Sequence, residues 1–321
     1  MARIGIHASH EILPPSTLLG LMQDAQSAGF GAAMSSDHFH PWTPAQGQSG
    51  FAWSWLGASL QATSFSHGVV CAPGQRYHPA VIAQACATLA EMFPGRFWVA
   101  IGSGQALNER ITGLPWPPKP IRDARLEECA LVMRALWRGE TVTHRGLVNV
   151  ERARLYTLPK SPPPLFGAAI TPQTASRVAR WADGLITAGK EHEDLKRIVA
   201  AFREAGGAGK PILLQSAIAY ADSEEAAARS ALRRWPVCAL GPEELEDTES
   251  PEHFEELIER VGVDAVRRRI RVSSDTSQHV SWIARDIELG FETIYLHHLG
   301  PDMNRFIRDF AERVLPAVSA N

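Results

Sequence analysis

The chain has 321 residues, of which 45% are hydrophobic and 21% are charged, and its formal net charge at pH 7 is −3. Without a basic excess, the electrostatic basis for binding nucleic acid is missing. No run of about 18 apolar residues could span a membrane, and the first residues lack the pattern of a signal peptide. We therefore expect a cytoplasmic protein, with no nucleic acid and no membrane involved.

Short apolar segments alternate with amphipathic segments along the chain. The segments that predict strands are 3–7, 32–35, 67–71, 97–101, 164–169, 184–187, 211–219 and 293–297. Apolar residues three and four apart predict helices at 16–28, 57–63, 78–92, 122–137, 174–181, 193–204, 223–235, 279–289 and 304–315. Eight strands that each lead toward a helix predict an α/β fold, a single (β/α)8 TIM barrel over 1–321. A two-Rossmann arrangement is the alternative, but segment 7–11 lacks the glycine that a phosphate-binding turn needs.

Four segments interrupt this alternation and are expected as insertions at the carboxyl-end face of the barrel. They are about 39–55, 104–121, 141–159 and 236–261. In the third, alternating residues around Arg145-Gly146 predict a hairpin. The fourth contains the acidic run 243–249, which is typical of a solvated surface segment. Long loops in a compact domain usually have a function or move.

Small and polar residues follow the predicted strands, at the end of a barrel where catalytic groups gather. Asp37-His38 is the strongest candidate, because a histidine can exchange a proton near neutral pH. A capped loop with a hydrogen-bonded histidine is the simpler explanation of the same pair. Gly102-Ser103-Gly104 is compatible with a close approach to a flat or anionic ligand and equally with a tight turn.

His38 and His40 also have the spacing of zinc ligands on a strand, with Asp37 or Glu11 as further ligands. A metal-dependent barrel hydrolase is therefore an alternative function. The expected further ligands do not follow the other strands, and His297-His298 is the one other histidine cluster of this kind. The sequence accordingly predicts no metal site.

Several motifs are similar to those of the bacterial luciferase-like superfamily, in particular to its F420-dependent sugar-6-phosphate dehydrogenases. The motifs are Ser36-Asp37-His38-Phe39-His40-Pro41-Trp42, the segments 76–85 and 104–109, and Ala182-Asp183-Gly184. The resemblance extends along nearly the whole chain. It implies a (β/α)8 barrel that binds FMN or coenzyme F420 and forms a homodimer.

The resemblance also implies roles for individual residues. His38 is expected to exchange a proton with the substrate, beside Trp42, with Glu11 and Gln105 as the other catalytic positions. Cofactor contacts are expected from Asp37, Val69, Val70, Ala72, Ser103, Gly104, Asn108, Ile170 and Thr171. Thr187, Lys190 and Arg269 match residues that hold a sugar phosphate in the family. Trp53 is a further expected substrate contact on separate grounds, because an aromatic side chain in an insertion over the mouth can border a flat ligand, although tryptophan is more often a core residue. Val69-Val70 corresponds to a bulge in which the family has a non-proline cis peptide bond.

Three departures from the dehydrogenase pattern affect the choice of cofactor. Gln105 replaces a glutamate that serves as the second acid/base, and a glutamine cannot titrate. Acidic residues around Leu245-Glu246-Asp247 replace a phosphate-binding lysine, and carboxylates repel a phosphate. Ala169-Ile170-Thr171-Pro172 replaces a glycine pair near the F420 phosphate.

These departures favour a flavin-dependent oxidoreductase that uses FMN for hydride transfer or monooxygenation of a small organic substrate. An F420-dependent alcohol or sugar-phosphate dehydrogenase is the alternative within the superfamily. A metal-dependent hydrolase and a non-catalytic flavin-binding barrel are the alternatives from other classes, the latter favoured by Gln105.

Overall fold

The computed structural model describes residues 2–189 and 191–319. Within these residues, eight parallel strands close into a barrel in the order β9-β11-β1-β2-β3-β4-β7-β8, with β8 paired to β9. The strands are β1 (Arg3–Ala8), β2 (Ala32–Ser36), β3 (Ser66–Cys71), β4 (Phe97–Ile101), β7 (Leu165–Ala168), β8 (Gly184–Ala188), β9 (Ile212–Ala219) and β11 (Thr293–His298). The predicted barrel is confirmed, and the two-Rossmann alternative is wrong.

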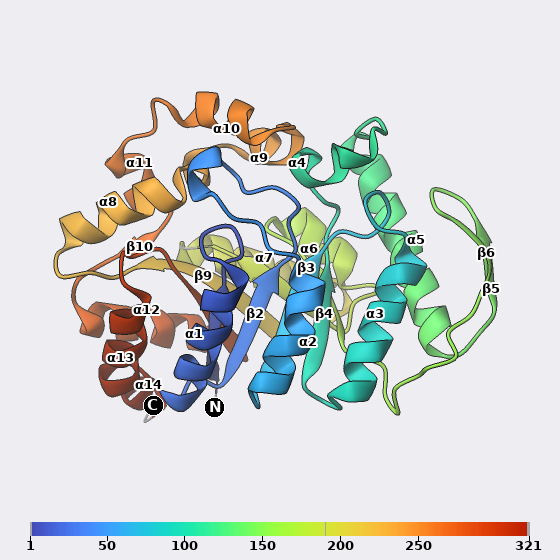
Figure 1. Ribbon diagram of the computed structural model, residues 1–321, viewed down its shortest axis with the longest axis horizontal. Helices are drawn as coiled ribbons and strands as arrows, with labels where there is room; N and C mark the ends of the chain where they lie inside the picture. Colours follow the sequence, from blue (N-terminus) through green and yellow to red (C-terminus); the bar gives the residue numbers. More distant parts are fainter. Residues whose placement is uncertain (1, 190, 320–321) are drawn as a thin grey trace.

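Helices surround the barrel (Figure 1). They are α1 (Pro15–Ser27), α2 (Ala52–Ala62), α3 (Pro79–Met92), α5 (Lys119–Trp137), α6 (Pro172–Val178), α7 (His192–Phe202), η3 (Arg203–Gly207), α8 (Glu224–Arg234), α12 (Thr276–Glu288), α13 (Met303–Arg313) and α14 (Leu315–Ser319). The short strand β10 (Arg271–Val272) pairs with the end of β9. Helix α2 begins before the predicted start at 57, because Trp53, Leu56 and Leu60 form one buried face. No helix in the described part of the chain is long and apolar enough to cross a bilayer.

The interior of the barrel changes character along its axis. Side chains alternate along each strand, and the inward-facing ones at mid-height form a tight apolar cluster of Ala32, Met34, Trp98, Ala100, Phe166, Ile186, Leu213 and Tyr295. Gly68 faces this cluster, where an added Cβ would lie 1.8 Å from the Trp98 ring. Two residues further along the strands, the inward positions are small or polar except for Val70: His7, Ser36, Val70, Gly102, Ala168, Ala188 and His297. We call the space bounded by this layer the barrel mouth.

Three insertions meet at the carboxyl ends of the strands, around the barrel mouth (Figure 1). They contain η1 (Pro44–Gln46), α4 (Ala106–Glu109), η2 (Arg110–Thr112), η4 (Pro236–Ala239), α9 (Pro242–Asp247) and α10 (Pro251–Ile258), and α11 (Val263–Arg267) follows. Residues of all three insertions form one apolar cluster, which consists of Trp42, Leu107, Val237, Leu240 and Phe254. Hydrophobic burial therefore joins segments that are far apart in the sequence.

The insertion at 141–159 lies elsewhere. Its predicted hairpin is confirmed as β5 (Val142–Arg145) and β6 (Asn149–Ala153). The hairpin follows α5 rather than a strand, and it lies on the outside of the barrel (Figure 1). Val148 and Val150 pack into the apolar core between the barrel strands and helices α2, α3 and α5, which we call the outer core. Val148 N donates to Glu128 Oε2 on α5 over 3.1 Å. The expectation that this insertion lies at the carboxyl-end face is wrong, because its apolar residues are buried against α5.

The acidic run 243–249 is attached to the body of the protein. Arg122 on α5 has a side chain that is only 2% exposed, and its Nη2 lies 2.7 Å from Glu246 Oε2 and 3.5 Å from Asp247 Oδ1. Trp116 Nε1 donates to Asp247 Oδ1 over 2.9 Å, and the guanidinium lies over the Trp116 ring. Most of this run is exposed, as expected, and Asp247 keeps a 60% exposed side chain, but the 27% exposed Glu246 is drawn against the protein because a buried arginine needs a partner for its charge.

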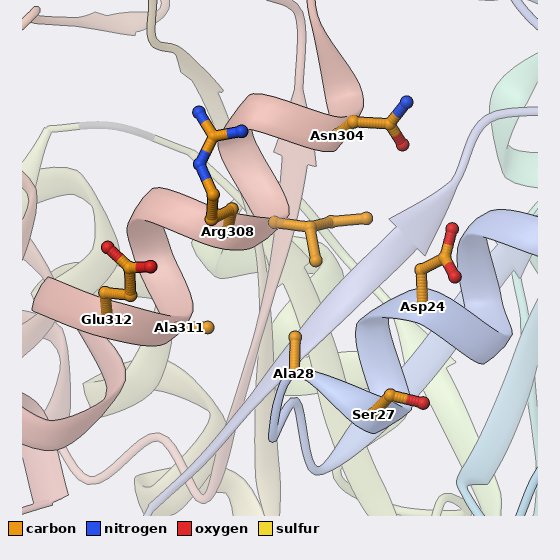
Figure 2. A pocket seen from close by; sticks show the side chains of 8 residues that line it. Asp24, Ser27, Ala28, Asn304, Arg308, Ala311 and Glu312 are labelled. Atoms are coloured by element: carbon orange, nitrogen blue, oxygen red, sulfur yellow. The ribbon is translucent and has the colours of Figure 1, made fainter.

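A surface groove of about 410 Å³ lies between α1 and α13, outside the barrel. Asp24 and Ser27 on α1 face Asn304, Arg308 and Glu312 across it (Figure 2). None of these residues belongs to the barrel mouth, where the sequence predicts the catalytic residues.

Candidate active site

The barrel mouth is open on the side formed by β3, β4, β7 and β8. Val70, Gly102, Ala168 and Ala188 are half-buried, although the residues before them on the same strands are almost fully buried. Small side chains at three of these positions leave room above the filled interior. A flat ligand could lie against this wall, because ligand sites of barrels form at this end.

His38 and Glu11 meet at the rim of the mouth, after β2 and β1. His38 Nδ1 lies 2.7 Å from Glu11 Oε1, and the two side chains are 16% and 5% exposed. Ser9 Oγ donates to the other carboxylate oxygen over 3.0 Å. The Trp42 ring approaches His38 edge-on, with 5.4 Å between ring centroids. The structure therefore brings three of the four predicted catalytic residues together.

The carboxyl group of Glu11 is held in its charged form. Burial by itself would raise the pKa of Glu11, but the charge of the His38 imidazole and its polar contact outweigh burial and hold the pKa below its ordinary value. A carboxylate at this place orients the imidazole and stabilises it when it carries a second proton.

The loop that carries His38 is attached to α4. Asn108 Oδ1 accepts hydrogen bonds from Phe39 N over 2.8 Å and from His40 N over 3.2 Å. Its Nδ2 donates to Gln105 Oε1 over 3.3 Å. Asn108 thus holds the loop of His38, and Gln105 is bonded to the Asn108 amide; their predicted contacts with the cofactor and the reacting centre remain predictions.

His40 faces away from His38. Its Nδ1 lies 2.8 Å from Leu107 O, whereas His38 Nδ1 faces Glu11. Among residues 2–189 and 191–319, no three histidine, cysteine, aspartate or glutamate side chains are arranged to hold a metal ion. The structure therefore gives no support to the metal-dependent hydrolase.

A buried arginine lies behind the catalytic loop, and the sequence-based reasoning assigned it no role. Arg76 Nη2 donates to Asp37 Oδ2 over 3.1 Å and to Asp37 O over 2.8 Å, and Arg76 Nε lies 3.4 Å from Glu109 Oε1. Burial raises the pKa of both Asp37 and Glu109, against the opposing charge of Arg76. The position of Arg76 within a motif shared with the superfamily was the signal that could have revealed it.

Cations lie beside the glycine-rich turn after β4. Lys119 Nζ donates to Ser103 Oγ over 2.9 Å and to Asp123 Oδ1 over 2.7 Å, and Arg177 Nη1 lies 2.5 Å from Asp123 Oδ2. Gly104 has a φ of +82° in the same turn. Lys119 and Arg177 were missed by the sequence-based reasoning, although Lys119 lies in a predicted insertion. Together they form a positively charged edge next to Ser103.

The remaining predicted cofactor contacts are placed unevenly. Val70 faces the mouth, whereas Val69 is buried in the outer core, as expected for neighbours on a strand. Ala72 is half-buried, Ile170 is 53% exposed, and Thr171 Oγ1 caps α6 by accepting from Thr174 N over 3.2 Å. Among the described residues no peptide bond is cis, and Val69 and Val70 keep regular register with β2 and β4. The expected bulge with a cis bond is therefore wrong.

The predicted substrate contacts differ in their burial. Thr187 is buried at the end of β8, and Arg269 is exposed after α11. Trp53 belongs to the outer core, where its ring lies 6.2 Å from that of Phe97. Lys190 lies outside the described residues.

Comparisons with known proteins agree with this fold. Residues 1–293 match the luciferase-like monooxygenase family. The chain is 36% identical to an F420-dependent glucose-6-phosphate dehydrogenase of Beutenbergia cavernae, over 100% of this chain and 98% of that protein. It is 34% identical to the enzyme of the same name from Nakamurella multipartita, over 99% and 97%.

A solved structure with a TM-score of 0.91 and 32% identity covers 99% of both chains, and it is an F420-dependent secondary alcohol dehydrogenase in complex with an F420-acetone adduct. The matched family and these relatives are all named for oxidoreductase activities. We conclude that this chain is an oxidoreductase that belongs to the luciferase-like monooxygenase family.

Proposed function

We propose that this protein is an F420-dependent dehydrogenase, which transfers a hydride between coenzyme F420 and the carbon that bears a hydroxyl or carbonyl group of a small organic substrate. The relatives above 30% identity are named for F420. FMN, which the sequence favoured, is not supported by these relatives. The proposal therefore adopts the alternative that the sequence left open.

The observation that carries the proposal is the contact between His38 and Glu11 at the barrel mouth, with 2.7 Å between Nδ1 and Oε1. Oxidation of an alcohol requires a base for the hydroxyl proton and a partner for the resulting imidazolium. His38 Nε2 is the nitrogen that does not face Glu11, and it takes or returns this proton. The Glu11 carboxylate stabilises the charged ring, so that the missing acid at Gln105 is not needed for this step.

The residues around the mouth fit the coenzyme. When bound, F420 supplies a flat deazaflavin ring that accepts or returns a hydride. The small residues Gly102, Ala168 and Ala188 leave a wall against which such a ring can lie. The cations Lys119 and Arg177 next to Ser103 can hold the anionic tail. Only glycine fits at position 104 without strain, because a Cβ there would lie 2.9 Å from Glu109 Cγ.

Two further properties belong to the proposal. The resemblance implies a homodimer, which sedimentation analysis of the purified protein would detect as twice the chain mass. The cytoplasm is the compartment in which the coenzyme would be available to this protein.

Titration of the tryptophan fluorescence with F420 and with FMN tests the choice of coenzyme. We expect F420 to quench the fluorescence with saturation and FMN to have no effect at the same concentrations. Saturable binding of FMN alone, or purification of a yellow protein that releases FMN, would contradict the proposal.

The role of His38 has its own test. We expect His38→Ala to keep the affinity for F420 but to lower turnover at least about 100-fold, the usual scale for loss of a general acid–base group. The matched control is His144→Gln on the outer hairpin, where the histidine contacts Glu128 far from the mouth, and it should leave turnover unchanged. Normal turnover of His38→Ala would remove His38 from the mechanism.

A further inference from the structure

Two histidines at the floor of the barrel mouth have no place in the mechanism above. His7 on β1 and His297 on β11 occupy inward positions on neighbouring strands, one step above the apolar filling. Their ring centroids lie 4.4 Å apart, and the Trp235 ring lies 4.6 Å from that of His297. The pair therefore forms a small imidazole surface across the mouth from the wall formed by β3, β4, β7 and β8.

The hydrogen-bonding groups of this pair are largely unused. His7 Nε2 lies 3.2 Å from Ser36 Oγ. Within residues 2–189 and 191–319, neither His7 Nδ1 nor either ring nitrogen of His297 has a hydrogen-bond partner. Both residues are buried, at 4% and 5% exposure. Unpaired polar atoms in a buried place are costly, so a hydroxyl or carbonyl oxygen that reached these nitrogens would gain hydrogen bonds that the protein itself does not supply.

Both rings are uncharged at neutral pH. Burial lowers the pKa of His7, with the charge of His297 as the next cause, and burial lowers the pKa of His297 to about 4. Glu11 opposes these shifts, whereas His10, His38, His298 and Arg234 add to one or the other. A neutral imidazole offers one N–H donor and one acceptor nitrogen.

This chemistry selects the kind of substrate. A hydroxyl group donates and accepts, and a carbonyl accepts, so both match a neutral imidazole pair. A phosphate offers only acceptors and negative charge, and the Glu11 carboxylate near the same surface would repel it.

We propose that His7 and His297, with Trp235, form a substrate subsite that binds an uncharged oxygen group, so that the protein acts on a small neutral alcohol or ketone and not on a sugar phosphate. The inference rests on the proposed function, because it assigns the substrate class of the same mouth. His7 and His297 bind and orient the substrate, while His38 moves the proton.

The test compares cyclohexanol with glucose 6-phosphate as probes and uses His297→Phe, which keeps a ring between His7 and Trp235 but removes the hydrogen bonds. In the F420-loaded full chain, we expect the KM for cyclohexanol to rise at least about tenfold, with the F420 affinity from tryptophan quenching unchanged. His297→Gln, which can donate and accept, should restore most of the affinity. The matched control is His279→Phe, a buried histidine outside the barrel that contacts Ser273 O, and it should leave KM unchanged.

A second measurement does not depend on turnover. The imidazole ¹⁵N signals of the chain without coenzyme, assigned by their loss in His297→Phe, should shift on addition of cyclohexanol and not of glucose 6-phosphate. Unchanged KM in His297→Phe, or glucose 6-phosphate that moves these signals and is turned over as well as cyclohexanol, would overturn the inference. Failure of F420 to quench the fluorescence refutes the proposed function instead, and the NMR titration still tests the subsite.

Discussion

Replacement of Arg76 by methionine tests whether the catalytic loop depends on the buried arginine behind it. Arg76 contributes the positive charge between the carboxylates of Asp37 and Glu109, whose side chains are fully or almost fully buried. Its guanidinium also donates to Asp37 O, directly before His38 in the chain. Methionine keeps much of the volume of the side chain but removes the charge and all of its hydrogen bonds.

The loss of folding stability in Arg76→Met can be estimated from these contacts. Removal of one partner from a buried ion pair costs about 3–5 kcal/mol, because the remaining charge is left without compensation. For a protein of this size, we expect the thermal midpoint to fall by roughly 5–10 °C. Turnover should fall as well, although His38 and Glu11 are intact, because the loop that positions His38 loses an anchor.

The loss of folding stability in Arg76→Met should depend on pH. Burial raises the pKa of Asp37 above 3.8 and that of Glu109 above 4.5, and Arg76 opposes both shifts. Without Arg76 the folded-state pKa values rise further above those of the unfolded chain. Stability is then retained at low pH, where the carboxyls are protonated, and is lost as pH rises through the folded-state values. The deficit of Arg76→Met should therefore be larger at pH 8 than at pH 5.

Urea unfolding at pH 5 and pH 8, followed by tryptophan fluorescence, measures both effects. The triple variant Asp37→Asn, Arg76→Met, Glu109→Gln removes the uncompensated charges and should recover at least half of the lost stability at pH 8. An equal loss at both pH values, or no recovery in the triple variant, would refute the electrostatic explanation.

Two more predictions follow from the site. Glu11→Gln should leave F420 affinity unchanged and lower kcat roughly 10- to 100-fold, the scale of one hydrogen bond to a charged group, in stopped-flow measurement of coenzyme reduction; wild-type kcat would show that His38 needs no carboxylate. Gly104→Ala should lower the free energy of unfolding by about 1–3 kcal/mol, because it combines a φ of +82° with a Cβ only 2.9 Å from Glu109 Cγ, and an unchanged urea midpoint would contradict this.

The local pattern of apolar and polar residues was sufficient to predict the barrel. Strand 97–101 was predicted with the bounds that the structure has, and strand 293–297 is one residue short of β11. Short apolar runs and amphipathic helices repeat at intervals that a parallel barrel requires, so each element is specified by residues close together in the chain. His38 could be selected on the same basis, because it follows a predicted barrel strand, at the end of the barrel where active sites form.

The start of α2 and the placement of the hairpin were harder to predict from the sequence. Trp53 could be read from the sequence either as a core residue or as a wall of the ligand site, and only the packing of α2 against the barrel places it in the outer core. The hairpin at 142–153 was predicted correctly as a hairpin, but its position depends on contacts with Glu128 and the outer core.

What the sequence by itself determined is the order and type of the elements, the barrel, and the family to which its motifs point. The tertiary structure decided which charged and polar groups meet: Arg76 with Asp37 and Glu109, Arg122 with Glu246, and His7 with His297. Helix and strand formation depend on neighbours within a few residues, whereas these pairs join residues 33 to 290 positions apart along the chain. Only the closure of the barrel brings them close enough for charge compensation and hydrogen bonding to act.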